Sequence, residues 1–120
     1  MQLPPCPSSP NCVSSDAPEG SHHVDPLMIE GNPEMAWSTA MQIVARWPRT
    51  TVVSEGPVLA RFECRSALFR FVDDLELQLR ADQGLIAVRS ASRVGHSDFG
   101  VNRKRVESLR QALQEAGVVR

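Results

Sequence analysis

The residues best suited to carry chemistry gather in one stretch of the sequence, residues 89–107, which reads RSASRVGHSDFGVNRKRVE. It passes from serines and arginines through two glycines into a predicted helix whose first turn is basic. A helix N-terminus exposes unpaired N–H groups and a partial positive charge, so nearby arginines complete a site that suits an anion. Basic residues in a first turn also oppose the helix dipole, and their charge needs an offsetting carboxylate or an external anion.

The candidate polar site combines these residues with an acidic pair from a preceding strand. Carboxylates, guanidinium groups, hydroxyls, an amide and an imidazole together suit ligand binding through charge-assisted hydrogen bonds. The predicted members are Asp73, Asp74, Arg89, Ser90, Ser92, Arg93, His96, Asp98, Asn102, Arg103 and Arg105. We expect the ligand to be an anionic small molecule or an acidic segment of a partner protein, and we expect no cofactor.

Other chemistries fit this stretch less well. The two glycines are followed by Val101 and Asn102 rather than by Lys and Ser, so the stretch is not a phosphate-binding P-loop. The basic residues lack a set of base-stacking aromatics and the net charge of the chain is −1, so we expect no nucleic-acid partner. The same charge argues against a protein that blankets an anionic membrane, although it leaves room for a local basic patch.

Two of the three cysteines lie close together in CPSSPNCVSS, before any hydrophobic periodicity begins. Cys6 and Cys12 enclose a loop that Pro7 and Pro10 stiffen. A disulfide between them would stabilise the fold by about 2.4 kcal/mol through loop entropy, and it requires an oxidising compartment. A reduced structural pair and a metal or redox site remain alternatives. The C-x5-C spacing with two adjacent histidines is a poor zinc pattern, so we predict no metal site.

The elements that position these residues follow an N-terminal segment with little periodicity. Residues 1–31 carry six of the nine prolines, which favours an extended arm packed on one domain over residues 32–120. A helix is predicted to begin at Asn32, which caps it, and to end at Pro48. The last helix is predicted over residues 102–116, with a glycine after it as the stop.

Between the two helices the hydrophobic period changes to two. Turn signals divide residues 50–93 into four alternating segments, which predict four strands. Helices on one face of an antiparallel meander are the natural arrangement for this order of elements. We therefore predict an α+β fold, an antiparallel four-stranded sheet with an N-terminal extended arm and two helices packed on one face.

Simple hairpins decide which side chains face the helices. A two-residue link at residues 66–67 pairs Phe62 with Phe71, and a four-residue turn later in the chain pairs Leu77 with Val88. Both hairpins give the same apolar face, so the predicted register is consistent. The residues expected on that face are Phe62, Cys64, Phe69, Phe71, Leu75, Leu77, Leu79, Ile86 and Val88.

The same register places one carboxylate on the apolar face and ion pairs on the other. Asp73 falls on the apolar face, where it needs a charged partner or several hydrogen-bond donors, and a facing serine or a backbone turn is the expected source. On the opposite face, Glu63 is expected to pair with Arg70 and Glu76 with Arg89. This face is either a solvated set of salt bridges or a polar binding surface.

Three motifs together resemble a known family. CPSSPNCVSS, FRFVDDLE and RSASRVGHSDFGVNRKRVE occur in the order found in domain of unknown function 1499, an uncharacterised family of bacteria and plastids. The resemblance covers nearly the whole chain and implies no reaction. It implies that the residues at family-motif positions are Cys6, Asn11, Cys12, Asp73, Asp74, Arg89, Ser90, Ser92, Arg93, Gly95, Asp98, Gly100, Asn102, Arg103 and Arg105.

The expected location follows from what the sequence lacks. No apolar run approaches the roughly 18 residues of a membrane span, and the start of the chain has neither the basic nor the apolar part of a secretory signal. Members of the resembled family commonly carry a leader or a membrane anchor, and this sequence shows neither pattern. We therefore expect no membrane span and a cytoplasmic location, or a periplasmic one if a leader has been removed.

Three functions remain open at this point. The favoured one is a small ligand- or partner-binding module with its polar site at the start of the last helix. The second is a hydrolase-like enzyme that uses Asp73 or Asp74 with His96 or a cysteine. Neighbouring residues of a strand point to opposite faces, which counts against an acid–base pair of these two carboxylates. The third is a purely structural salt-bridge network in an assembly protein.

Overall fold

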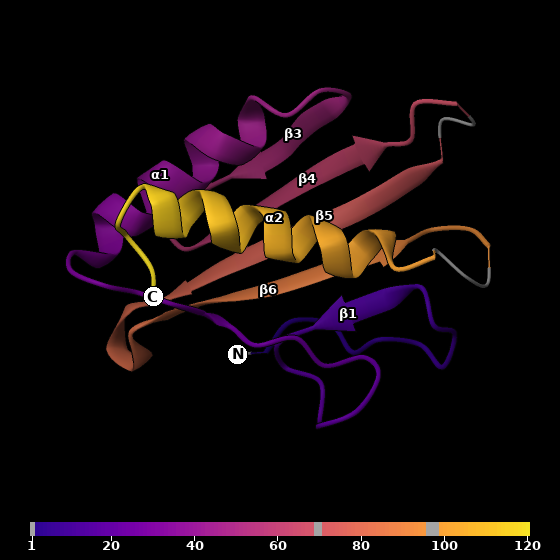
Figure 1. Ribbon diagram of the computed structural model, residues 1–120, viewed down its shortest axis with the longest axis horizontal. Coiled ribbons are helices and arrows are strands. Elements are labelled where there is room, and N and C mark those ends of the chain that lie inside the picture. The colour runs from indigo at the N-terminus through magenta and orange to yellow at the C-terminus, as the bar shows by residue number, and fades with distance from the viewer. Residues whose placement is uncertain (1, 69–70, 96–98) are drawn as a thin grey trace.

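The computed structural model describes residues 2–68, 71–95 and 99–120, and Figure 1 shows one sheet crossed by two helices. The elements, in chain order, are β1 (Cys12–Ser14), β2 (Leu27–Met28), α1 (Pro33–Ala45), β3 (Thr50–Glu55), β4 (Leu59–Arg65), β5 (Val72–Arg80), the short 3-10 helix η1 (Ala81–Gln83), β6 (Leu85–Ser92) and α2 (Val101–Glu115). The strands pair antiparallel in the order β1-β6-β5-β4-β3, and β2 also pairs with β6.

The predicted α+β fold with an antiparallel sheet and two helices is confirmed. The prediction of four strands is wrong, because the sheet has six within the described residues. The two extra strands come from the N-terminal arm. Val13 of β1 pairs with Ser90 and Leu27 of β2 pairs with Ile86, so both strands lie along β6. Strands of three and two residues are too short to show a period of two, so the sequence pattern does not reveal them.

The two long hairpins differ in how well their register was predicted. The β5–β6 hairpin has the predicted register, with Leu77 opposite Val88. In the β4–β5 hairpin, Phe62 faces Leu75 instead of Phe71, a shift of four residues. An even shift keeps the paired side chains on their predicted faces, so Phe62 is still buried. Phe71 lies in the longer connection between the strands with its side chain 53% exposed, so its assignment to the core is wrong.

The helices and the apolar face of the sheet enclose the core. α1 begins where predicted, because Asn32 Oδ1 accepts a hydrogen bond from the Met35 backbone nitrogen at 2.8 Å and Pro33 takes the first helical position. The helices and the sheet bury Ala36, Trp37, Ala40, Met41, Val44, Phe62, Cys64, Leu75, Leu77, Leu79, Ile86, Val88, Val106, Leu109 and Leu113. Of the predicted core residues, Phe69 lies outside the described part of the chain. Packing of α2 against β6 brings the first turn of this helix to the end of that strand.

Candidate functional site

The Asp73 carboxylate has a cationic partner on the apolar face of the sheet. Asp73 Oδ2 lies 2.9 Å from Nη1 of Arg105, which comes from the first turns of α2. The two side chains are only 11% and 14% exposed. The same nitrogen donates to Ser90 Oγ at 3.1 Å and to Asn102 Oδ1 at 2.8 Å. The predicted need for a charged partner is therefore met by α2 rather than by the facing serine or a turn.

Asn102 joins α2 to the sheet and to the N-terminal arm. Its side chain is fully buried, accepts from Ser90 Oγ at 2.7 Å, and donates to Ser92 Oγ at 2.9 Å and to the Asn11 carbonyl at 3.2 Å. Asn11 Nδ2 in turn donates to the Gly95 carbonyl at 2.6 Å. We call Asn11, Asp73, Ser90, Ser92, Asn102 and Arg105 the polar frame. It cross-links three segments that lie far apart in the sequence.

A disulfide joins Cys6 to Cys12, the residue next to Asn11 of the polar frame. Cys12 is 1% exposed and faces Ala91 across the β1–β6 ladder, so the disulfide is anchored to the sheet. Beyond it, residues 2–6 cross the face of the sheet opposite the helices, where the Pro5 carbonyl accepts a hydrogen bond from Arg89 Nη2 at 3.2 Å. The disulfide thus holds the start of the chain against β6.

The third cysteine, Cys64, is free and 5% exposed. Burial raises the pKa of its thiol, with Arg105 acting in the opposite direction. A buried thiol with a raised pKa is a poor nucleophile, so Cys64 behaves as the small apolar core residue that the sequence predicted.

The opposite face of the sheet carries a cluster of ion pairs centred on Arg93. Arg93 binds Asp74 through Nε and Nη2 at 2.9 and 2.8 Å, and its Nη2 lies 2.6 Å from Glu63 Oε2. Arg65 Nη2 donates to the other oxygen of Glu63 at 2.9 Å. Hydrogen bonds from Arg93 hold the pKa values of Asp74 and Glu63 below their ordinary values. Arg70, the predicted partner of Glu63, lies outside the described residues.

A second ion pair on this face has the predicted partners. Glu76 faces Arg89 in the register, and Glu76 Oε1 lies 3.2 Å from Arg89 Nη1, which confirms this cross-strand pair. Both side chains are 12% exposed. Within the described residues, Arg89 Nε is a buried polar atom without a hydrogen-bond partner. Through its contacts with Glu76 and with the Pro5 carbonyl, Arg89 links this face of the sheet to the arm that covers it.

The residues predicted to form one polar site are divided by the sheet. Asp73, Ser90, Ser92, Asn102 and Arg105 lie on the helix side and are joined in the polar frame. Asp74, Arg89 and Arg93 lie on the other side.

Arg103 belongs to neither of these two groups. It binds the arm instead, donating to the carbonyls of His23 and Ser21 at 3.0 and 2.7 Å. His96 and Asp98 fall outside the described part of the chain. The sequence motif thus supplies an internal network more than an open cavity.

A cationic hollow that the sequence analysis missed lies beside the polar frame. Two adjoining hollows of about 280 and 660 Å³ share Arg49, Thr50 and Arg65 in their walls. The smaller one is also lined by Trp47, Pro48, Cys64, Arg105 and Ser108. We call the pair the arginine hollow. Its residues come from the connection between α1 and β3, from β3 and β4, from the residues that follow β4 and from α2, so only the fold brings them together. The one local hint is the basic residue between a helix-stopping proline and a strand.

Arg49 has an unusual backbone conformation for a residue with a side chain, with φ at +54°. Its Nε donates to the Arg65 carbonyl at 3.2 Å. No residue in the described ranges accepts a hydrogen bond from its two terminal nitrogens, and Arg49 enters no ion pair there. The guanidinium group therefore keeps donors available to a ligand.

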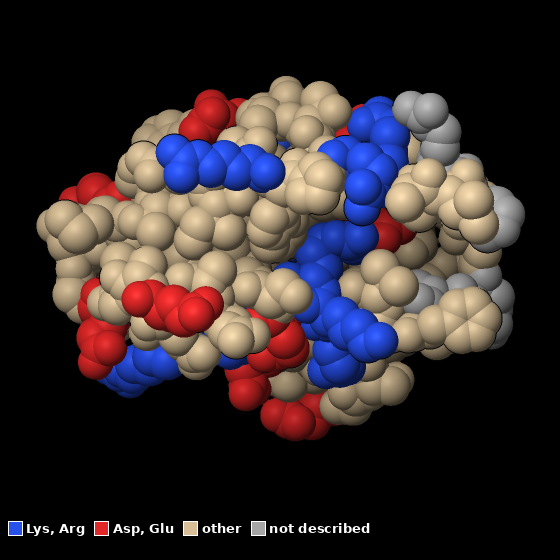
Figure 2. All heavy atoms as spheres, turned by 45° about the horizontal axis from the view of Figure 1, so that its top comes forward, with Lys and Arg blue, Asp and Glu red and all other residues tan. Residues whose placement is uncertain are grey.

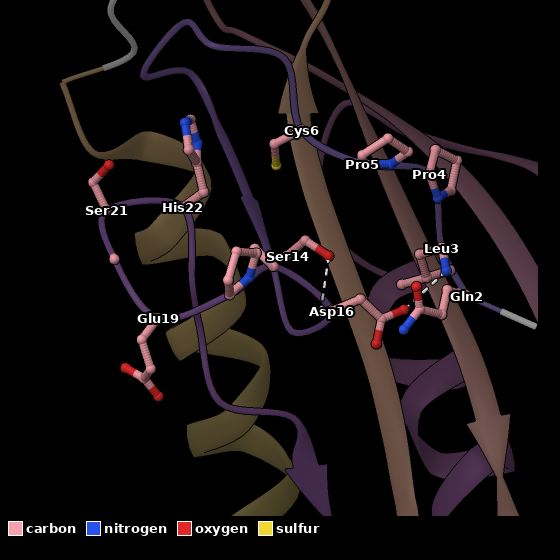
Figure 3. A pocket seen from close by; sticks show the side chains of 13 residues that line it. Gln2, Leu3, Pro4, Pro5, Cys6, Ser14, Asp16, Glu19, Ser21 and His22 are labelled. Atoms are coloured by element: carbon pink, nitrogen blue, oxygen red, sulfur yellow. Dashed lines mark hydrogen bonds between the residues drawn. The ribbon is translucent and has the colours of Figure 1, made fainter.

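A different pocket, of about 560 Å³, separates residues 2–6 from the loop over residues 14–22. Figure 3 shows Pro4, Pro5 and Cys6 on one side of it and Glu19, Ser21 and His22 on the other. His22 Nδ1 lies 2.9 Å from the Cys12 carbonyl. The polar groups of this pocket are largely engaged in holding the arm in place.

Asp16, in the wall of that pocket, forms a two-point ion pair with Arg80 at 2.6 and 2.8 Å and accepts a hydrogen bond from the Leu3 nitrogen. The hydrogen bonds from Arg80 are the main cause that holds the pKa of the Asp16 carboxyl below its ordinary value of 3.8. A depressed pKa stabilises the folded state above the ordinary carboxyl pKa, and this contribution is lost as the pH falls through the folded-state value.

We therefore expect Asp16→Asn to lower the free energy of unfolding by about 1.5 kcal/mol at neutral pH, and the difference from the parent protein to shrink as the pH falls below the ordinary carboxyl range. Urea unfolding at a series of pH values measures this. Asp82→Asn, at an exposed carboxylate of η1, is the control and should show no such pH-dependent difference. A difference for Asp16→Asn that stays constant with pH would contradict the assignment.

Two wider features of the described residues bear on function. They contain no group of three or more His, Cys, Asp or Glu side chains placed to hold a metal ion. No helix among them combines the length and apolar character needed to cross a membrane.

Comparisons with known proteins place the chain in context. A family model described as "Protein of unknown function (DUF1499)" matches residues 2–113, nearly the whole chain. No curated protein and no solved structure matches it. The resemblance that the three sequence motifs indicated is therefore confirmed.

Proposed function

Since the chain belongs to the DUF1499 family, whose description names no activity, we propose that it is a binding module for anionic ligands with the arginine hollow as its site. The observation that carries this proposal is the composition of the walls. Arg49, Arg65 and Arg105 line the hollow, and among the described residues no Asp or Glu does. A concave site lined by cations concentrates anionic ligands, because its low-dielectric walls strengthen their electrostatic attraction.

The three arginines differ in how far their charge is already neutralised. Arg65 lies 2.9 Å from Glu63, which it shares with Arg93, and Arg105 lies 2.9 Å from Asp73. Arg49 has no such partner within the described ranges. The hollow therefore keeps a net positive charge, and Arg49 is its main source.

Hydroxyl groups on the walls add neutral hydrogen-bond donors. Ser66 Oγ accepts a hydrogen bond from the Phe71 backbone nitrogen, and within the described residues it donates its own proton to no acceptor. Ser108 and Thr51 also line the hollow. Guanidinium forks with hydroxyls beside them match the several acceptor oxygens of a phosphate group, so phosphate-bearing molecules are the proposed ligand class.

The strained backbone at Arg49 supports the same site. A non-glycine residue in the left-handed region costs energy and persists where the surrounding structure enforces it, commonly at functional sites. Here the conformation turns the chain from α1 into β3 and directs the residue to the wall of the hollow.

The polar frame supports this function by positioning Arg105 rather than by binding the ligand itself. Its members hydrogen-bond one another, so they hold the first turns of α2 against the sheet. The hydrolase-like alternative gains no support within the described residues. Asp73 and Asp74 project to opposite faces, and each is already held by an arginine.

Isothermal titration of the full chain with inorganic phosphate and with pyrophosphate tests the proposal. We expect binding that weakens as salt is added, and an affinity for both ligands about tenfold lower in Arg49→Gln, because one unpaired cation is removed from the site. Arg46→Gln is the matched control, since Arg46 is an exposed arginine at the end of α1 that does not line the hollow.

The control should bind within about twofold of the parent protein. Two results would refute the proposed site: no heat of binding for either ligand at low salt, or equal affinities for the parent protein and Arg49→Gln. Equal losses in Arg49→Gln and Arg46→Gln would instead indicate non-specific attraction to surface charge.

A further inference from the structure

Two connections at one end of the molecule carry large exposed apolar side chains. The β4–β5 and β6–α2 connections both reach this end, on the right in Figure 1, and the Arg93 nitrogen donates to the Val72 carbonyl at 3.1 Å, so the two connections start side by side. We call the exposed apolar residues there the loop end: Leu68 (80% exposed), Phe71 (53%), Val94 (56%), Phe99 (89%) and Val101 (45%). Such a group of exposed apolar residues marks an interaction surface.

The shape of the loop end favours a lipid surface over a peptide as its partner. Its residues lie on two connections and at the first position of α2, and each is at least 45% exposed. Within the described residues, the hollows contain none of Leu68, Phe71, Val94 and Phe99 in their walls. A projecting apolar tip has no shape that selects a peptide helix or strand, but it can enter the boundary between lipid headgroups and acyl chains.

A basic band borders the loop end. Figure 2 shows Lys and Arg side chains crossing this face of the molecule in a continuous band. The basic residues that line the arginine hollow or lie in the first turns of α2 are Arg49, Arg65, Arg103, Lys104 and Arg105, and we call them the basic band. The net charge of the whole chain is −1, so this concentration of positive charge is local.

We propose that the protein docks on the surface of a bilayer that contains anionic lipids, with the loop end inserted at the headgroup boundary and the basic band on the lipid phosphates. Apolar burial together with attraction to anionic headgroups is the combination that gives stable interfacial binding. The inference deepens the proposed function, on which it rests, because it names lipid headgroups as the source of the anion. The part of the proposal that concerns apolar insertion depends on the loop end alone.

The polar frame explains how a small fold keeps such a surface in place. Both connections start from strands that the frame and Arg93 hold together, through Asp73 and Asp74 of β5 and through Ser92 at the end of β6. The frame also fixes the first turn of α2, which carries three of the basic residues. The apolar tips and the basic band are thus presented on the same rigid end.

Co-sedimentation of the full chain with vesicles tests the docking. One set of vesicles is phosphatidylcholine alone, and the other contains phosphatidylglycerol as well. We expect binding to the anionic vesicles at least about tenfold tighter than to the neutral ones, and a loss of about tenfold in Leu68→Ser with Phe99→Ser, because two exposed apolar anchors are removed. Arg49→Gln should lose about fivefold.

A matched double variant controls for loss of exposed apolar surface in general. Met35→Ser with Val53→Ser removes two apolar side chains that are 63% and 47% exposed on α1 and β3, away from the loop end. It should bind anionic vesicles within about twofold of the parent protein. Equal binding by the parent protein and Leu68→Ser with Phe99→Ser would overturn the docking, as would equal binding to neutral and anionic vesicles.

Titration of the same variants with inorganic phosphate separates the two proposals. Leu68→Ser with Phe99→Ser should keep the phosphate affinity of the parent protein. Vesicle binding without phosphate binding would leave the docking intact and refute the arginine hollow as a soluble-anion site. Phosphate binding without vesicle binding would overturn the docking and leave the arginine hollow as a site for soluble anions. Binding to an acidic peptide such as polyglutamate, with none to vesicles, would overturn the docking in favour of a protein partner.

Discussion

Replacing Arg105 with methionine is expected to lower the free energy of unfolding by about 3–5 kcal/mol, because the Asp73 carboxylate would stay buried without its cation. Arg105 Nη1 and Asp73 Oδ2 lie 2.9 Å apart, and neither side chain is more than 14% exposed. The same nitrogen donates to Ser90 and Asn102, so both would lose a donor inside the fold. Methionine fills much of the vacated volume, so the loss reports mainly the broken polar contacts. Urea unfolding at neutral pH measures it.

Lys104→Met is the control for this variant, because Lys104 is exposed on the same turn of α2. It should change the free energy of unfolding by no more than about 0.5 kcal/mol. Adding Asp73→Asn to Arg105→Met removes the unpaired charge and should restore part of the stability, as in a double-mutant cycle. A loss below about 1 kcal/mol in Arg105→Met alone would show that the buried pair does not hold the frame together.

Loss of the Cys6–Cys12 disulfide is expected to lower the free energy of unfolding by about 2.4 kcal/mol, the loop-entropy value for a closed loop of this length. The double variant Cys6→Ser with Cys12→Ser, or reductant added to the parent protein, removes this disulfide. The loss should be concentrated in the arm, because Cys12 pairs with Ala91 and the carbonyl of the neighbouring Asn11 accepts hydrogen bonds from Ser92 of β6 and Asn102 of α2. Backbone amides of β1 should therefore exchange hydrogen faster, whereas those of β5 change little.

The serine variant supplies the control for reductant, which should not alter its stability. Cys64→Ala, at the free buried thiol, should keep the full response to reductant. If the parent protein has the same stability with and without reductant, the disulfide does not stabilise the arm as argued here. Mass spectrometry of the intact chain shows in each sample whether the bond is present.

The sequence predicts the parts of this fold that local signals control. The Asn32 cap, the α-helical periods and the β5–β6 hairpin follow from such signals, since Gly84 adopts the positive φ that ends that turn. The β4–β5 hairpin has no comparable turn residue between Ser66 and Phe71, so the shorter link was predicted and the register shifted. The shift was even, so the described residues of the predicted buried face are buried apart from Phe71, and Phe69 lies outside the described residues.

The candidate site is harder to predict, because it depends on contacts between distant segments. Burial of Asp73 follows from strand alternation, but its partner Arg105 is chosen by the packing of α2 on the sheet. Alternation also separates Asp73 from Asp74, so the predicted cluster divides between two faces. The arginine hollow joins residues from β3, β4, α2 and the connections beside them, and no spacing in the sequence signals that Arg49 and Arg105 line the same hollow.

The pairing of β1 with β6 also constrains how the chain is made. The arm is synthesised before β6, so Cys12 has no strand to pair with until Ala91 has been made. Such distant contacts form late, because the entropy of closing a long loop has to be overcome. The two cysteines are only six residues apart, so their disulfide can form without any distant part of the chain. In an oxidising compartment, the disulfide can therefore form in the nascent arm before most of the sheet that the arm packs against has been synthesised.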